Sequence, residues 1–179
     1  MALCVLALLV GVVGCDKSQP VVALPDLPVE QRQANAKQGA EAVGAATASG
    51  DYAAVVDATY PPVIQLAGGR ERMLKTMSGP AAQSADQEFK ITGTTMGDVK
   101  QEVKDGSRFY AVINGRMRMT GPRGVLLSSI QTLGISEDGG RTWKYIAVVN
   151  PDDVRRVIPT LSASLELRKQ GPPTFFASE

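Results

Sequence analysis

The chain has 179 residues, with 19 basic and 18 acidic side chains and a formal net charge of +1. This balance, without any block of like charge, argues against nucleic acid as a partner. Histidine is absent, and the only cysteines are Cys4 and Cys15. The chain after residue 15 therefore has no imidazole base, thiol nucleophile or disulfide, which excludes His- or Cys-based metal sites and a Ser-His-Asp triad. We expect no metal or cofactor, and a non-catalytic role, although carboxylates, lysines and tyrosines remain as candidate catalysts.

Residues 1–14 form an apolar stretch with small residues at its end, directly before Cys15. The stretch is shorter than the ~20 residues that a membrane-spanning helix needs, so its length is typical of a signal peptide. It lacks, however, the Lys or Arg that a typical signal peptide has near its start. Val12-Val13-Gly14-Cys15 resembles the lipobox of bacterial lipoproteins. That resemblance implies a signal peptide at 1–14, lipidation of Cys15 and attachment to the inner or outer membrane of the bacterial cell envelope, on the periplasmic side. Asp16 resembles the inner-membrane retention signal of enterobacterial lipoproteins.

A tether and then a series of helices follow the cysteine. Residues 15–28 contain three prolines, which favour an extended tether that spans about 30–40 Å. Asp51 is the expected N-cap of the second helix. Apolar periodicity predicts helices over 29–49, 52–59 and 70–77, and short helical turns at 63–66, 81–85 and 152–158.

From residue 89 onward, alternation of apolar and polar residues indicates strands. It predicts strands over 89–92, 98–103, 108–120, 125–135 and 142–149, with a hairpin turn at Asp105-Gly106 and a loose tail after Gly171-Pro172-Pro173. The longest strand has one apolar face, made by Phe109, Ala111, Ile113, Met117 and Met119. Its other face carries Tyr110, Asn114, Arg116 and Arg118.

Helices followed by strands predict an α+β fold, with N-terminal helices packed on a curved antiparallel sheet of about four strands. The N-terminal helices are the only cover expected for this sheet. We place the domain at 29–160 and a C-terminal extension at 161–179.

Residues 136–143, with the sequence Ser-Glu-Asp-Gly-Gly-Arg-Thr-Trp, resemble the Asp-box hairpin of sialidase propellers. A single box in a chain too short for four blades predicts a β-hairpin and not a propeller. Asp138 is then a turn residue that accepts bonds from turn amides, and Trp143 packs under the turn.

The order of elements resembles the nuclear-transport-factor-like, or cystatin-like cone, superfamily. Three segments are similar to uncharacterised bacterial proteins of that kind: 50–61, 68–73 and 133–143. The resemblance implies a cavity between helices and sheet, which some relatives use for catalysis and others for binding. Enzymes of that superfamily often use an Asp or a His-Asp pair, so the resemblance implies only a carboxylate base in a chain without histidine, and Asp57 is the nearest candidate. Because charged residues are rarely buried, a solvated aspartate on the helix surface is the simpler interpretation.

The candidate binding residues are Tyr60, Tyr110, Arg116 and Arg118, and no catalytic residue is assigned. Arg108, Arg116 and Arg118 form a cationic stripe that suits an anionic envelope component or a protein; the alternative is the wet face of an antiparallel sheet. Tyr60 is large enough to line a cavity, or to pack in the core. Three functions remain open: an anchored binding module for an envelope protein or small apolar ligand, a carboxylate-based isomerase or lyase, and a structural lipoprotein that forms a homodimer.

Overall fold

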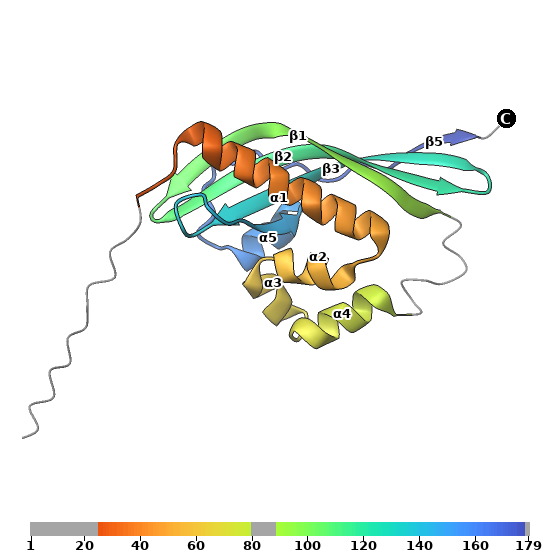
Figure 1. Cartoon of the computed structure of the whole chain (residues 1–179), viewed down its shortest axis with the longest axis horizontal. Coiled ribbons are helices and arrows are strands. Elements are labelled where there is room, and N and C mark those ends of the chain that lie inside the picture. The colour runs from red at the N-terminus through yellow and green to blue at the C-terminus, as the bar shows by residue number, and fades with distance from the viewer. Residues whose placement is uncertain (1–24, 80–88, 178–179) are drawn as a thin grey trace, which may run out of the picture.

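The computed structural model describes residues 25–79 and 89–177 (Figure 1). The expected signal peptide, Cys15, most of the expected tether and the helical turn expected at 81–85 lie outside these residues. The helices are α1 (Val29–Ser49), α2 (Tyr52–Ala58), α3 (Pro61–Leu66), α4 (Arg70–Ser78) and α5 (Pro151–Val157). The strands are β1 (Lys90–Asp105), β2 (Arg108–Gly121), β3 (Gly124–Ser136), β4 (Lys144–Ala147) and β5 (Thr174–Ala177).

The strands form one curved antiparallel sheet in the order β1-β2-β3-β4, and β5 also pairs with β3. On β3, residues 132–135 pair with β4 and residues 124–127 pair with β5. The α+β class and the antiparallel sheet preceded by helices are confirmed. No helix in the described ranges is long and apolar enough to cross a membrane.

Local signals set the helix boundaries. The Asp51 carboxylate accepts a hydrogen bond from the Ala54 amide at 3.1 Å, so the predicted N-cap of α2 is confirmed. Gly50 closes α1 in a left-handed conformation with a φ of 76°. Helix α3 begins at Pro61, because a proline at the first helical position loses no hydrogen bond.

Three strand predictions differ from the structure. The two strands expected at 89–92 and 98–103 are one strand, β1, which register shifts near Gly93 and Val99 interrupt without ending. Strand β4 is shorter than expected because Thr142 and Trp143 belong to the preceding turn. The expected loose tail contains β5, whose residues 174–177 pair with β3.

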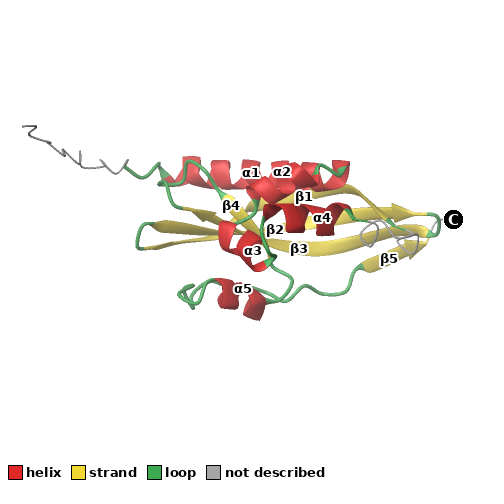
Figure 2. Ribbon diagram, turned by 90° about the horizontal axis from the view of Figure 1, so that it is seen from below, coloured by secondary structure: helices red, strands yellow, loops and turns green. Residues whose placement is uncertain are grey.

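The sheet has an apolar core on each face. Helix α1 packs on one face, and α5 lies on the other (Figure 2). The α1 side is built from Ala36, Ala40, Met96, Phe109, Ala111, Ile113, Trp143 and Tyr145. The opposite side is built from Tyr60, Tyr110, Val112, Leu133, Ile135, Ile146, Val148, Val154, Ile158, Leu161 and Leu165.

The second core corrects the expectation that the N-terminal helices alone cover the sheet. Val154 of α5 and Ile158, Leu161 and Leu165 of the following segment are all buried against it. The region expected to be an extension, 161–179, thus supplies core residues as well as β5. Two parts of the hairpin β2–β3 differ as a result: the root half, residues 108–114 with 131–136, and the distal half, residues 115–121 with 124–130.

Candidate functional site

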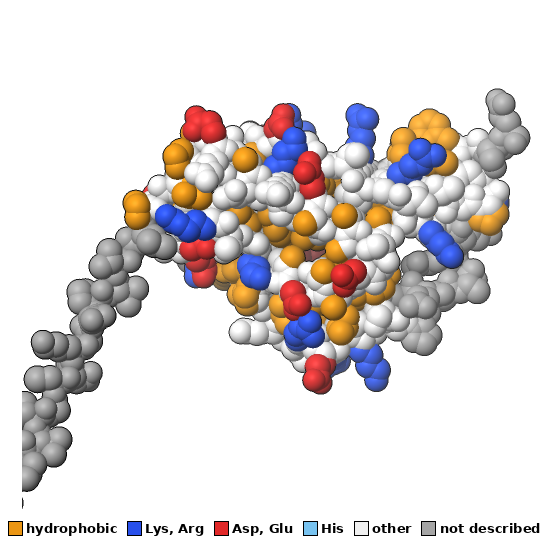
Figure 3. All heavy atoms as spheres, in the orientation of Figure 1, with side chains coloured by type: hydrophobic (Ala, Val, Ile, Leu, Met, Phe, Trp, Pro, Cys, Tyr) orange, Lys and Arg blue, Asp and Glu red, His pale blue; other side chains and the backbone are white. Residues whose placement is uncertain are grey.

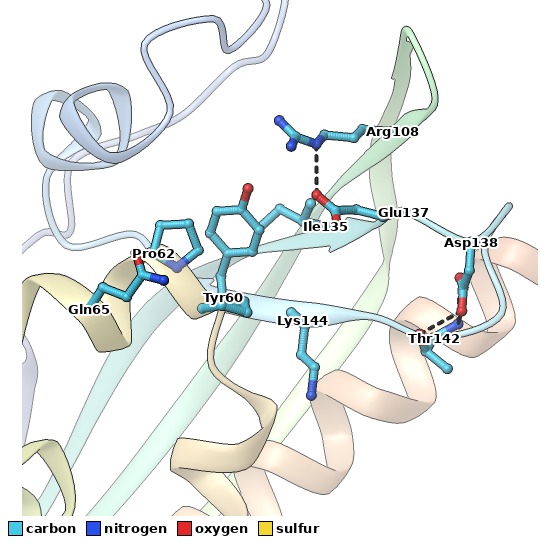
Figure 4. Close-up of a pocket in the computed structure, with 10 residues that line it drawn as sticks. Tyr60, Pro62, Gln65, Arg108, Ile135, Glu137, Asp138, Thr142 and Lys144 are labelled. Carbon is cyan, nitrogen blue, oxygen red and sulfur yellow. Dashed lines mark hydrogen bonds and ion pairs between the residues drawn. The ribbon is translucent and has the colours of Figure 1, made fainter. Parts of the chain in front are cut away.

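A pocket of about 430 Å³ opens at the root of the hairpin, where the α2–α3 junction meets the ends of β3 and β4 (Figure 4). Its apolar wall consists of Tyr60, Pro61, Pro62 and Ile135. Polar groups complete the lining: Gln65, Arg108, Glu137, Asp138, Thr142 and Lys144. A concave site with an apolar wall and a few polar groups is the usual form of a small-ligand site.

Tyr60 is positioned by the backbone on both sides of it. Its amide donates to the carbonyl of Tyr145 at 3.0 Å, which ties the α2–α3 junction to the edge of β4. Pro61 then starts α3 and fixes the direction of the chain. The Tyr60 ring consequently lies beside Pro62 and Ile135 (Figure 4).

The polar end of the pocket is an ion pair. Arg108 Nε donates to Glu137 Oε1 at 2.8 Å, and the Tyr60 hydroxyl points toward this end (Figure 4). A hydrogen bond to the Tyr110 side chain, followed by the field of Tyr60, raises the pKa of Arg108. Burial raises the pKa of Tyr60, and the positive charge of Arg108 lowers it by a smaller amount. At neutral pH the site therefore presents a neutral phenol and a guanidinium.

Lys144 contributes its stem to the pocket and directs its charge away. Its Nζ donates to the Asp57 carbonyl at 2.6 Å, and Figure 4 shows the ammonium group pointing away from the Tyr60 hydroxyl. Arg108 is thus the cation at the polar end, and a ligand anion would compete with Glu137 for it.

The Asp-box turn forms one side of the pocket, and the prediction for Asp138 is confirmed. Asp138 Oδ1 accepts from the amides of Arg141 and Thr142 at 3.0 and 2.9 Å, and the Thr142 hydroxyl donates to Oδ2 at 2.6 Å. Burial raises the pKa of Asp138, but these bonds and one from Ser136 outweigh it and lower the pKa overall. Trp143 packs under the turn and donates to the Gly140 carbonyl at 3.1 Å.

The same turn also holds the start of the described chain. The Leu27 amide donates to the Gly139 carbonyl at 2.9 Å, and Arg141 Nη2 donates to the Pro25 carbonyl at 2.8 Å. Asp26 forms an ion pair with Lys104. The described chain therefore begins at the end of the domain where the pocket lies.

The structure separates the four predicted binding residues. Tyr60 lines the pocket. Tyr110 is 1% exposed in the core behind it, so it offers no surface of its own. Arg116 and Arg118 are exposed on the distal half of β2, outside the pocket.

Asp57 is a solvated aspartate on the surface of α2, as the simpler interpretation of the sequence predicted. Its carboxylate receives two bonds from Arg70, at 2.7 and 3.0 Å, on the exposed side of α2. The hydrogen bond to Arg70 lowers its pKa, so it is not tuned to act as a general base. In the pocket, the pKa values of Tyr60, Arg108 and Asp138 all move away from neutrality.

Sequence reasoning missed the pocket residues Gln65, Glu137 and Lys144 as a group. Part of the signal was present in the sequence, because Glu137 lies within the Asp box and Pro61-Pro62 follows the second helix. It also missed Glu102, whose side chain is 8% exposed and pairs with Arg32 at 2.6 Å. Glu102 Oε2 has no hydrogen-bond partner, but Glu102 lies under α1 and outside the pocket lining. Within 25–79 and 89–177, no group of three metal-ligating side chains occurs.

No known protein family, curated protein or solved structure matches the chain.

Proposed function

We propose that this chain is a lipid-anchored protein of the bacterial cell envelope with a non-catalytic, cone-like binding domain similar to the nuclear-transport-factor-like proteins. Its ligand is a small, partly apolar molecule. The pocket carries the proposal: an apolar wall of Tyr60, Pro62 and Ile135 faces a hydrogen-bonding end at Arg108. A binding role also agrees with the occupied state of the pocket carboxylates, since Glu137 pairs with Arg108 and Asp138 bonds the turn.

The proposed anchor gives this pocket a defined place relative to the membrane. The turn at 137–142 both lines the pocket and binds residues 25–27. Acylation at Cys15, followed by a tether of about 30–40 Å, keeps that end of the domain close to the bilayer. The pocket then samples molecules at or near the membrane surface.

The anchor is tested by feeding bacteria that express the full chain with an alkyne-labelled palmitate. The wild-type protein should carry the label. It should also fractionate with membranes, because several acyl chains on Cys15 would attach it stably, whereas one chain would not. Cys15→Ser should abolish labelling, whereas Cys4→Ser should label as the wild type does. Labelling that survives Cys15→Ser contradicts the anchor.

Ligand binding is tested on the full chain by ¹⁹F NMR with 4-fluorophenylacetate and 4-fluorobenzyl alcohol. Each probe has an aromatic ring for the apolar wall, and they differ in charge. Both resonances should broaden with the wild-type protein. Arg108→Gln should reduce the broadening of the carboxylate more than that of the alcohol, because it removes the cation at the polar end.

Two matched variants on α3 place the probes. Gln65→Trp fills the lining, and Leu66→Trp adds the same ring at a neighbouring position that is exposed and outside the lining. Gln65→Trp should abolish the broadening, and Leu66→Trp should leave it unchanged. Absence of broadening with the wild type at millimolar probe, or equal broadening in both variants, contradicts a ligand site in this pocket.

A further inference from the structure

The distal half of the sheet has an open face on the side opposite to α1. Register places three rows of neighbours there: Arg116 beside Ser129, Arg118 beside Leu127, and Thr120 beside Val125. Lys90 extends the last row on one side and Phe176 on the other. We call Lys90, Arg116, Arg118, Leu127 and Phe176, with the positions between them, the distal face.

This face is exposed although it carries large apolar groups. Phe176 is 52% exposed and Leu127 is 36% exposed, and Lys90, Arg116 and Arg118 are exposed as well. The cover that buries the same side of the root half, α5 and residues 158–165, packs on residues such as Tyr110 and Leu133. Figure 2 shows β5 at the far end of the sheet from α5. An open face with apolar side chains marks a contact surface.

The charge of the distal half has one sign. No Asp or Glu occurs between Asp105 and Glu137, in 89–97 or in 167–177. The guanidinium groups of Arg116 and Arg118 form no hydrogen bond or ion pair within the part of the chain that the structure describes. On the side of the molecule drawn in Figure 3, no red side chain lies at the hairpin end. Glu88 and Glu179 adjoin β1 and β5 in sequence and lie outside the described residues.

Three kinds of surface could cover the distal face: a second copy of the chain, a polyanionic sugar or a phospholipid bilayer. The guanidinium, aromatic and aliphatic groups of the face fit one of them best. A second copy bound through the same face would bring two sets of Lys90, Arg116 and Arg118 into one interface without an acidic residue between them, and this like-charge contact is unfavourable. A polyanionic sugar would pair with the arginines but has no apolar region for Leu127 and Phe176. An anionic phospholipid surface offers phosphates to arginine and an acyl boundary to the apolar groups.

The dimensions allow this contact in an anchored molecule. Strand β2 has 14 residues and so spans about 45 Å from the root to the tip. The tether spans a similar length, so a domain anchored at the root end can lie down with its tip on the same bilayer. This step alone depends on the proposed anchor; the chemistry of the face does not.

We propose that the distal face docks on an anionic phospholipid bilayer, with Arg116 and Arg118 bound to phosphates and Phe176 and Leu127 at the acyl boundary. Docking at the tip would hold the domain flat on the membrane that anchors its other end.

The test uses the full chain with Phe176→Trp as a reporter, and vesicles whose acyl chains carry bromine, which quenches indole at short range. Vesicles of pure phosphatidylcholine measure attachment through the N-terminal segment alone, and vesicles with phosphatidylglycerol measure docking of the tip. We expect additional quenching on the anionic vesicles, reduced by raised salt. The wild-type chain, which has only the buried Trp143, supplies the background.

Arg116→Gln with Arg118→Gln should lower the apparent affinity for anionic vesicles, measured by this additional quenching, roughly thirtyfold. Each cation near an anionic surface raises the affinity about fivefold. Arg72→Gln with Lys75→Gln, which removes the same charge from exposed positions on α4, should leave it unchanged. Unchanged thermal unfolding confirms that the variants are folded.

Equal quenching on neutral and anionic vesicles overturns the proposal, as does an unaffected Arg116/Arg118 double variant. A reporter that responds to soluble polyglutamate and not to vesicles assigns the face to an acidic polymer, and dimerisation that the double variant abolishes assigns it to a second copy. None of these results bears on the ¹⁹F probes in the pocket or on acylation at Cys15, so the two proposals fail separately.

Discussion

The root and distal halves of the β2–β3 hairpin lie on the same two strands, yet one is core and the other is surface. In the root half, Phe109, Tyr110, Ala111, Val112 and Ile113 are consecutive and all buried, because both faces of the sheet are covered. In the distal half, exposed and half-buried residues alternate along β2. A strand that packs between two layers becomes continuously apolar, whereas a strand with one open face keeps its alternation.

The difference comes from segments that are remote in sequence. Helix α1 covers the root on one side, and α5 with the segment after it covers the other. Gln131 lies where this second cover ends: it donates to Asn114 at 3.0 Å and accepts from the Arg168 amide at 2.8 Å. Beyond that point the face is open, and the structure places exposed arginines where the root has Tyr110 and Val112.

The largest effect should come from a pair of leucines on one face of β3. Leu133 is 0% exposed in the root half, and Leu127 is 36% exposed in the distal half. Leu133→Ala should lower the free energy of unfolding by about 3 kcal/mol, because it leaves a cavity in the core. Leu127→Ala should change it by less than about 0.5 kcal/mol. Urea unfolding followed by circular dichroism measures both, and equal losses would contradict the division into two halves.

The strands were predictable because alternation and turn residues act locally. The parity of β2 is correct, since Phe109, Ala111 and Ile113 share one core. The second core was not predictable in the same way. It depends on Leu161 and Leu165, which lie in a segment without regular structure and therefore show no periodicity. The alternation along β2 alone consequently predicts a surface position for Tyr110.

The candidate site was predictable only in pieces. Tyr60 and Arg108 stood out singly, as a large aromatic and a cation, but they are 48 positions apart in the sequence. What joins them is the pairing of Thr59 with Tyr145 outside the regular strands and the curvature of the sheet, both of which are tertiary contacts. By contrast, the Asp box was fully predictable, because its hydrogen bonds connect residues within four positions of one another.

An intermediate effect is expected at the Asp-box turn, which supports the root half alone. Asp138→Ala leaves the amides of Arg141 and Thr142 without their acceptor and should lower the free energy of unfolding by about 2 kcal/mol. Asp105→Ala, at the exposed last residue of β1, should cost less than about 0.5 kcal/mol. Thermal unfolding at neutral pH measures the difference, and a smaller loss at Asp138 than at Asp105 would refute it.

The same residue gives the root half a pH dependence. Because hydrogen bonds lower the pKa of folded Asp138 below its ordinary value of 3.8, its contribution is complete above that value and is lost as the pH falls through the folded pKa. The free energy of unfolding should therefore fall more steeply below about pH 4 in the wild type than in Asp138→Asn. Parallel acid profiles for the two proteins would contradict this assignment.

The smallest effect should have opposite signs at Gly134 in the root half and at Gly93, which lies on β1 beside the distal half. A Cβ at Gly134 would lie 3.1 Å from Trp143 and 3.4 Å from Tyr145, whereas one at Gly93 would meet nothing within 4 Å. Gly134→Ala should thus destabilise the fold by about 1 kcal/mol through overpacking. Gly93→Ala should stabilise it by about 0.5 kcal/mol, because alanine loses less backbone entropy than glycine on folding. Urea midpoints that move in opposite directions would show that the distal face has free space directly beside Arg118, where the proposed lipid contact needs it.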